Sequence, residues 1–169
     1  GGGILVTTFS CATQTIVTPV ATPLNSGVSI ACATLPADAA TSCCELVCST
    51  GGCFDVPSPT HFELSGFRLR GGGSAATSGA AVTITGYSLT QSVVLTSLHF
   101  SAHVARALVL RSVTVTLSSS TFTDCKATVG NSGGALLIET SSTLIATACT
   151  FRNNSVAGAA ASGGAIAVR

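Results

Sequence analysis

The chain of 169 residues carries seven basic and six acidic side chains, which gives a formal net charge of +1. Charged residues make up only 8% of the chain, against roughly 25% in an ordinary soluble domain, so the composition excludes a basic surface for nucleic acid or an anionic membrane. No run approaches the about 18 strongly apolar residues of a membrane-spanning helix, and no membrane span is expected.

Residues 1–6 are expected to form the first strand of a repeated unit. They read Gly-Gly-Gly-Ile-Leu-Val and match Gly-Gly-Ala-Ile-Ala-Val at 163–168, where small residues precede alternating aliphatic side chains. The chain would then begin and end on the same strand of the unit. Because stacked repeats without polar caps leave their edge strands open, we predict either end-to-end self-association or a longer parent chain.

Residues 7–59 are predicted to be an insertion that disulfides hold together, because they contain all five prolines and six of the eight cysteines. An even cluster of this kind is typical of an oxidising, extracellular compartment, and fifteen connectivities are open. No metal site is expected, because the spacing lacks paired Cys-x-x-Cys knuckles and a nearby histidine. The disulfide candidates are Cys11, Cys32, Cys43, Cys44, Cys48 and Cys53.

Residues 60–169 contain about four copies of one pattern. In each copy, mostly apolar or small residues lie seven, five and two positions before a phenylalanine, and a second strand follows a connection of variable length. That second strand has the same frame at 79–84, 105–110, 133–138 and 163–168. The predicted core ladder consists of Phe67, Phe100, Phe122 and Phe151.

Period-2 alternation and aliphatic content predict β-strands. Short segments of this kind bury their apolar faces only when copies stack at about 4.8 Å per layer, which favours an all-β parallel β-helix. The Gly-Gly pairs at 133–134 and 163–164 suit corners that need positive φ or close backbone approach. The alternative is a β-sandwich of hairpins, in which equal offsets about phenylalanine are not required.

The Gly-Gly-Ala-Ile element at 163–166 and the Phe-x-x-Asn element at 151–154 resemble the paired motifs of chlamydial polymorphic outer membrane proteins and of wider right-handed parallel β-helix repeats. Only this last copy is complete, since Cys125 stands where the copy at Phe122 would have its asparagine. The resemblance covers residues 60–169 and 1–6. It implies an elongated surface domain with a right-handed parallel β-helix fold that serves in adhesion or scaffolding.

No catalytic residue, cofactor or metal ligand is predicted. Enzymes with parallel β-helices gather acidic and basic residues on one face, and a polysaccharide lyase or hydrolase would require Glu63, Asp124 and Glu139 to converge in one groove. His99 and His103 are interpreted as exposed residues near a turn, because four residues of extended strand separate them by roughly 13 Å.

Asn153 begins an Asn-Asn-Ser tripeptide and is the candidate N-glycosylation site, and Asn154 is a candidate ladder residue. Cys125 and Cys149 lie at different offsets from their phenylalanines, so free buried thiols are at least as plausible as a bridge.

The sequence therefore predicts a secreted or cell-surface, non-enzymatic structural protein, a subunit or segment of a surface fibre, appendage or adhesin, with glycans as possible partners. A carbohydrate-binding or adhesion module is the alternative. One tyrosine and no tryptophan argue against a platform that stacks on sugar rings.

Overall fold

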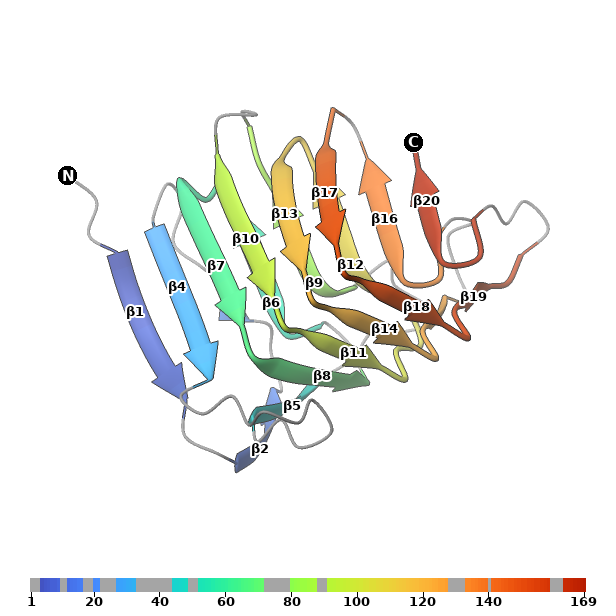
Figure 1. Ribbon diagram of the computed structural model, residues 1–169, viewed down its shortest axis with the longest axis horizontal. Coiled ribbons are helices and arrows are strands. Elements are labelled where there is room, and N and C mark those ends of the chain that lie inside the picture. The colour runs from blue at the N-terminus through green and yellow to red at the C-terminus, as the bar shows by residue number, and fades with distance from the viewer. Residues whose placement is uncertain are drawn as a thin grey trace.

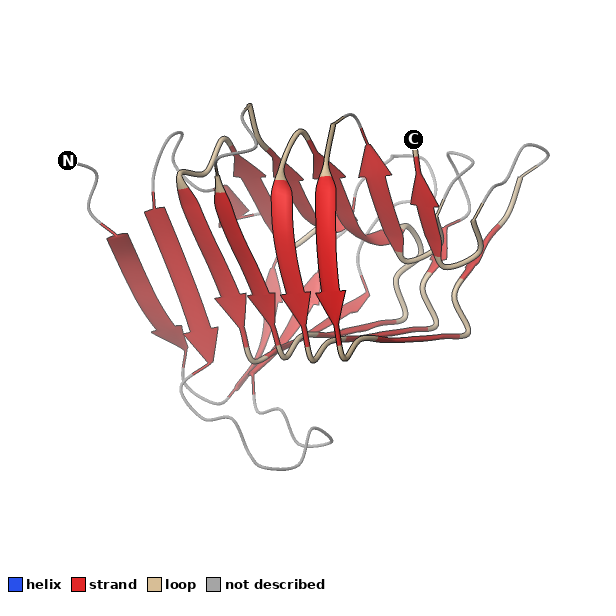
Figure 2. Cartoon of the chain, turned by 45° about the horizontal axis from the view of Figure 1, so that its top comes forward, coloured by secondary structure: helices blue, strands red, loops and turns tan. Residues whose placement is uncertain are grey.

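The computed structural model is all-β, and its described part contains no helix (Figure 1, Figure 2). It describes residues 4–9, 12–16, 20–21, 27–32, 44–48, 52–71, 80–87, 91–127, 133–139, 141–158 and 163–169.

Three six-stranded sheets, called A, B and C, are built from parallel pairs only. Sheet A contains β1 (Ile4–Phe9), β4 (Gly27–Cys32), β7 (His61–Ser65), β10 (Ser92–Thr96), β13 (Thr114–Ser118) and β17 (Thr143–Thr147). Sheet B contains β2 (Ala12–Ile16), β5 (Cys44–Cys48), β8 (Phe67–Gly71), β11 (His99–Ser101), β14 (Thr121–Thr123) and β18 (Thr150–Arg152). Sheet C contains β3 (Val20–Ala21), β6 (Phe54–Pro57), β9 (Ala80–Thr85), β12 (Arg106–Arg111), β16 (Leu136–Glu139) and β20 (Ile166–Val168). A small extra pair joins β15 (Lys126–Ala127) to β19 (Ser155–Val156).

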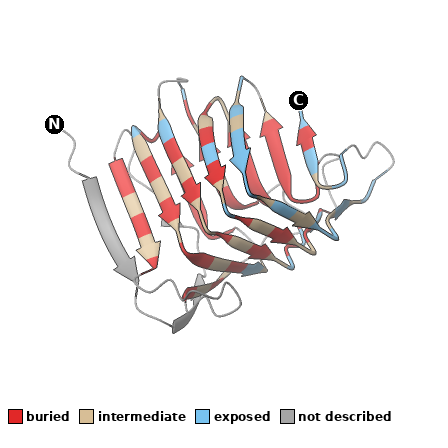
Figure 3. Ribbon diagram, viewed as in Figure 1, coloured by how far each residue is buried: buried red, intermediate tan, exposed pale blue. Residues whose placement is uncertain are grey.

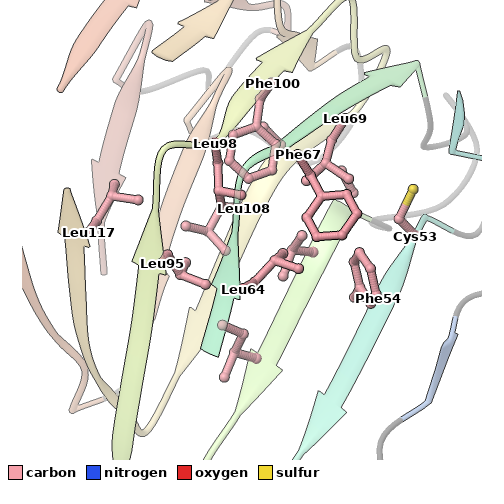
Figure 4. Close-up of a cluster of buried hydrophobic side chains, with 14 of the residues drawn as sticks. Cys53, Phe54, Leu64, Phe67, Leu69, Leu95, Leu98, Phe100, Leu108 and Leu117 are labelled. Carbon is pink, nitrogen blue, oxygen red and sulfur yellow. The ribbon is translucent and has the colours of Figure 1, made fainter. Parts of the chain in front are cut away.

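The chain visits sheets A, B and C in turn, and each visit to all three is called a layer. The described strands make six layers, from β1–β3 at one end of the stack to β17, β18 and β20 at the other. Residues from all three sheets share one buried cluster, so the core lies between the sheets (Figure 4). Each strand contributes every second side chain to this core: in β7 and β10 the inward residues are buried, and the residues between them are not.

The predicted insertion at 7–59 is wrong for the residues that the structure describes. They include the end of β1 and β2 to β6, which extend the same three sheets through two further layers. The alternation is present in β4 and β5, but cysteines fill inward positions there, such as Cys44 and Cys48, so the phenylalanine spacing did not find them. The region after residue 60 forms four layers, as the repeat predicts.

The predicted equivalence of the first and last strands is also wrong. β1 pairs with β4 in sheet A, whereas β20 pairs with β16 in sheet C. Glycines followed by aliphatic residues precede strands of both sheets, so this pattern does not identify the sheet. The remaining matches hold, because Val82, Leu108, Leu136 and Ile166 occupy one column of sheet C.

Phenylalanines stack along the core as the offsets predict. The ring centroids of Phe100 and Phe122, and those of Phe122 and Phe151, are 4.7 Å apart, with interplanar angles of 10° and 6°. Phe67 does not belong to this ladder, because Leu69 pairs with Phe100. Phe67 and Leu69 both face inward and are fully buried, because residues two apart lie on the same face of a strand.

In the four layers after residue 60, each corner between sheets A and B contains one residue with positive φ: Gly66, Ser97, Ser119 and Ala148. Glycine also supplies positive φ at the corners just before sheet C, where φ is +64° at Gly133 and +67° at Gly163. A Cβ on Gly133 would overlap the carbonyl oxygen of Leu136. Positive φ and close backbone approach are therefore both present at these glycines.

Candidate functional site

The three carboxylates that a polysaccharide-cleaving site would need do not meet. Glu63 lies on β7 in sheet A, where its carboxylate accepts a hydrogen bond from the Ser29 hydroxyl at 3.1 Å. Glu139 lies on β16 in sheet C and forms an ion pair with Arg111 at 2.7 Å. Asp124 follows β14 at the corner that leaves sheet B. The acids therefore occupy different sides of the stack.

Within the described residues, no group of three or more His, Cys, Asp or Glu side chains is arranged to hold a metal ion. The two histidines of β11 and its following corner are also separated, because one faces outward and the other inward. His99 is half-buried, and its ring hydrogen-bonds the Thr121 hydroxyl of the next layer.

The two disulfides of the described chain lie at two corners of one layer. Cys32, at the end of β4, is bonded to Cys44 at the start of β5, with 5.9 Å between the Cα atoms. Cys48, at the end of β5, is bonded to Cys53 just before β6. The other two candidates, Cys11 and Cys43, lie outside the described residues.

A column of three unusual residues follows the phenylalanine ladder on its way out of sheet B. His103, Cys125 and Asn154 each lie three residues after their core phenylalanine, and we call them the corner column. The backbone joins their layers, since the amide of Lys126 donates to the His103 carbonyl and the amide of Ser155 donates to the Cys125 carbonyl.

His103 is a buried, neutral member of this column and not the exposed residue that the sequence predicted. Only 1% of it is exposed, and its Nε2 donates to the Leu69 carbonyl at 3.0 Å, which fixes the proton on that nitrogen. Burial lowers the pKa of His103 to about 4. Its Nδ1 has no hydrogen-bond partner in the described part of the chain.

Cys125 is a protonated thiol at neutral pH. It is a fully buried free cysteine, and burial raises its pKa to about 12. Since the thiolate is the reactive form, a nucleophilic role does not fit this position. Cys149, the other free cysteine of the described chain, is half-buried and lies in the last layer.

Asn154, the last member of the corner column, forms side-chain hydrogen bonds to the backbone of the preceding layer. Its Oδ1 accepts from the Cys125 amide at 3.0 Å, and its Nδ2 donates to the Phe122 carbonyl at 2.9 Å. One side chain therefore satisfies both a donor and an acceptor of the preceding turn. The common offset from phenylalanine locates the column in the sequence; the burial of His103 does not follow from that offset alone.

Asn153, the glycosylation candidate, is exposed at the corner beside this column. Its φ of 53° is in the left-handed region, which asparagine tolerates better than most residues. The side chain that would carry a glycan is thus outside the core.

Residues of the last layer are less buried than those of the layers before it (Figure 3). Phe151 is half-buried, whereas Phe122 in the preceding layer is fully buried. Ile166 and Val168, in register with the inward positions of β16, are 39% and 72% exposed. β17, β18 and β20 each have a partner strand on one side only. We call this surface the end face.

The outward side of sheet A over the last three layers carries hydroxyl groups and no charge. Its three columns follow the register of β10, β13 and β17. We call this surface the hydroxyl face; it consists of Ser92, Val94, Thr96, Thr114, Thr116, Ser118, Thr143, Ile145 and Thr147.

Comparisons with known proteins give no relative: no protein-family model, no curated protein and no solved structure matches the chain. Among the described residues, no helix is long and apolar enough to cross a membrane. The disulfides are compatible with a secreted protein.

Proposed function

We propose that the chain is a right-handed parallel β-helix that acts as an extracellular structural element, a subunit or segment of a surface fibre, appendage or adhesin. The motifs that resemble chlamydial polymorphic outer membrane proteins support this proposal. It is also supported by the passage of the chain through sheets A, B and C in fixed order and by the in-register stack of Phe100, Phe122 and Phe151. Stiffness would come from the hydrogen-bond ladders along the stack.

The end face is the observation that carries the proposal. Its apolar side chains are exposed, and each of its three strands has an unpaired edge. At its opposite end, a second copy has one edge strand in each sheet: β1 in sheet A, β2 in sheet B and β3 in sheet C. These three strands can therefore pair with β17, β18 and β20 of the first copy, sheet by sheet. Such a head-to-tail contact does not close on itself and produces a filament. More chain of the same kind would cover the end face in the same way.

Electron microscopy of the non-reduced protein over a concentration series tests the assembly. We expect filaments with an axial repeat of six strand spacings, or about 29 Å. Ile166→Lys places a charge on the end face and should abolish them. Ile145→Lys is the matched control, because Ile145 belongs to the same layer but faces outward on β17 and is 54% exposed.

Two results would contradict self-assembly: single particles at every concentration, or filaments of Ile166→Lys as long as those of the control. Glycan-array binding by such single particles would favour the carbohydrate-binding module instead. Folding is monitored by circular dichroism, since both substituted side chains are exposed in the wild-type protein.

A further inference from the structure

The hydroxyl face is a regular two-dimensional array. Thr114 pairs with Thr143, Val94 with Thr116, and Thr116 with Ile145, so its columns run straight across three strands. Neighbouring strands are about 4.8 Å apart, and alternate residues along a strand about 6.7 Å. The array ends at β7, where His61 and Glu63 occupy the corresponding positions.

The positions of these hydroxyl groups are fixed by the fold. The strands that carry them pair with one another within sheet A, and residues such as Val115 and Leu117 are fully buried beneath the face. Threonine is branched at Cβ and has restricted χ1, so little side-chain entropy remains to be lost on binding. The hydroxyls of Thr96 and Ser118, 3.2 Å apart, already form a hydrogen bond between two layers.

The chemistry of the face selects a neutral, repetitive partner. A hydroxyl group both donates and accepts, and the threonines, Val94 and Ile145 add methyl groups to the same face. No charged residue belongs to the face to attract an ion, and no aromatic ring belongs to it to stack on a sugar. In tetrahedral water with O···O distances of about 2.8 Å, second-neighbour oxygens lie about 4.5 Å apart. That separation is close to the strand spacing.

We propose that the hydroxyl face binds the surface of ice, with rows of threonine and serine hydroxyls occupying or bridging lattice water positions. The strand ladder sets the spacing, and the methyl groups sit against the gaps between bound waters. This binding does not depend on filament formation, since every residue of the face belongs to one chain.

Nanolitre osmometry and partition into a slowly growing ice hemisphere test the proposal on the full, non-reduced chain. The wild-type protein should facet ice crystals, separate their melting and freezing temperatures, and enter the ice. Thr116→Lys, at the centre of the face, should lose all three effects. Thr123→Lys is the matched control in the same layer, because Thr123 faces outward on β14 in sheet B.

A second variant, Thr114→Lys, guards against a folding defect specific to position 116, and circular dichroism checks all three proteins. The proposal is overturned if the wild-type protein is excluded from ice like serum albumin. It is equally overturned if Thr123→Lys loses as much activity as Thr116→Lys. Retention of the wild-type protein on crystalline cellulose or chitin without incorporation into ice would also overturn it, and would assign the face to a polysaccharide.

Discussion

Replacement of Phe122 by alanine probes the central ring of the phenylalanine stack. Phe122 is fully buried and has a ring 4.7 Å away on each side. Removal of a buried phenylalanine costs about 3–5 kcal/mol, and two stacked contacts are lost here, each contributing about 0.5–1.5 kcal/mol. Measured losses of this kind already include such contacts, so the two stacked rings place Phe122→Ala at the upper end of the range, and we expect the free energy of unfolding to fall by about 4–5 kcal/mol. Phe151→Ala loses one stacked contact from a half-buried side chain, and about 1–2 kcal/mol is expected.

Urea denaturation of the non-reduced protein, followed by far-ultraviolet circular dichroism, measures both variants. Phe122→Leu is the control for volume and should recover most of the loss, because it refills the cavity but does not restore the stack. Equal destabilisation by Phe122→Ala and Phe151→Ala would refute the assignment of these rings to the interior and the end of one stack. A loss below about 2 kcal/mol for Phe122→Ala would refute the cavity argument.

Two further predictions concern the corner column. Asn154→Ala removes the side chain that bonds the Cys125 amide and the Phe122 carbonyl, and it should lower the free energy of unfolding by about 2–3 kcal/mol. The rate of hydrogen exchange at the Cys125 amide should rise, and an unchanged rate would contradict this hydrogen bond. The pKa of His103 is lowered to about 4 in the folded protein, so the unfolded chain binds a proton first as pH falls. The free energy of unfolding should therefore drop by about 3 kcal/mol as the pH falls from 6.5 to 4. Urea denaturation at several pH values should show a smaller pH dependence of this free energy for His103→Gln, and an equal pH dependence would assign the effect to other groups.

The layers after residue 60 could be predicted from sequence because each contains an inward aromatic or aliphatic residue at a constant offset. The first two layers could not, since cysteines take inward positions in β5 and the strand β3 has only two residues, Val20–Ala21. Because the side chains of a strand alternate with a period of two, a register error of two residues leaves the inward-facing pattern unchanged. The pattern therefore predicts Phe67 as the ladder residue, although Leu69 occupies that place.

The side of a corner residue was harder to predict than the side of a strand residue. His99 and His103 are four apart, and simple alternation would put them on one face. A positive φ of 54° at Ala102 interrupts the alternation, so His103 turns into the core while His99 remains outside. Tripeptides such as Ser-Ala-His carry no strong signal for this geometry, because alanine rarely adopts it.

The recurring corner between sheets A and B has a consequence for how such a chain can change in length. Gly66, Ser97, Ser119 and Ala148 turn the backbone in the same way, although 22 residues separate Phe100 from Phe122 and 29 separate Phe122 from Phe151. In the four layers after residue 60, the variation in length falls elsewhere in the layer. A duplication or deletion that starts and stops at this corner therefore joins two compatible ends. We expect the length of the molecule to change by whole layers, so that genetic gain or loss of one unit shifts the distance between its ends by a single strand spacing.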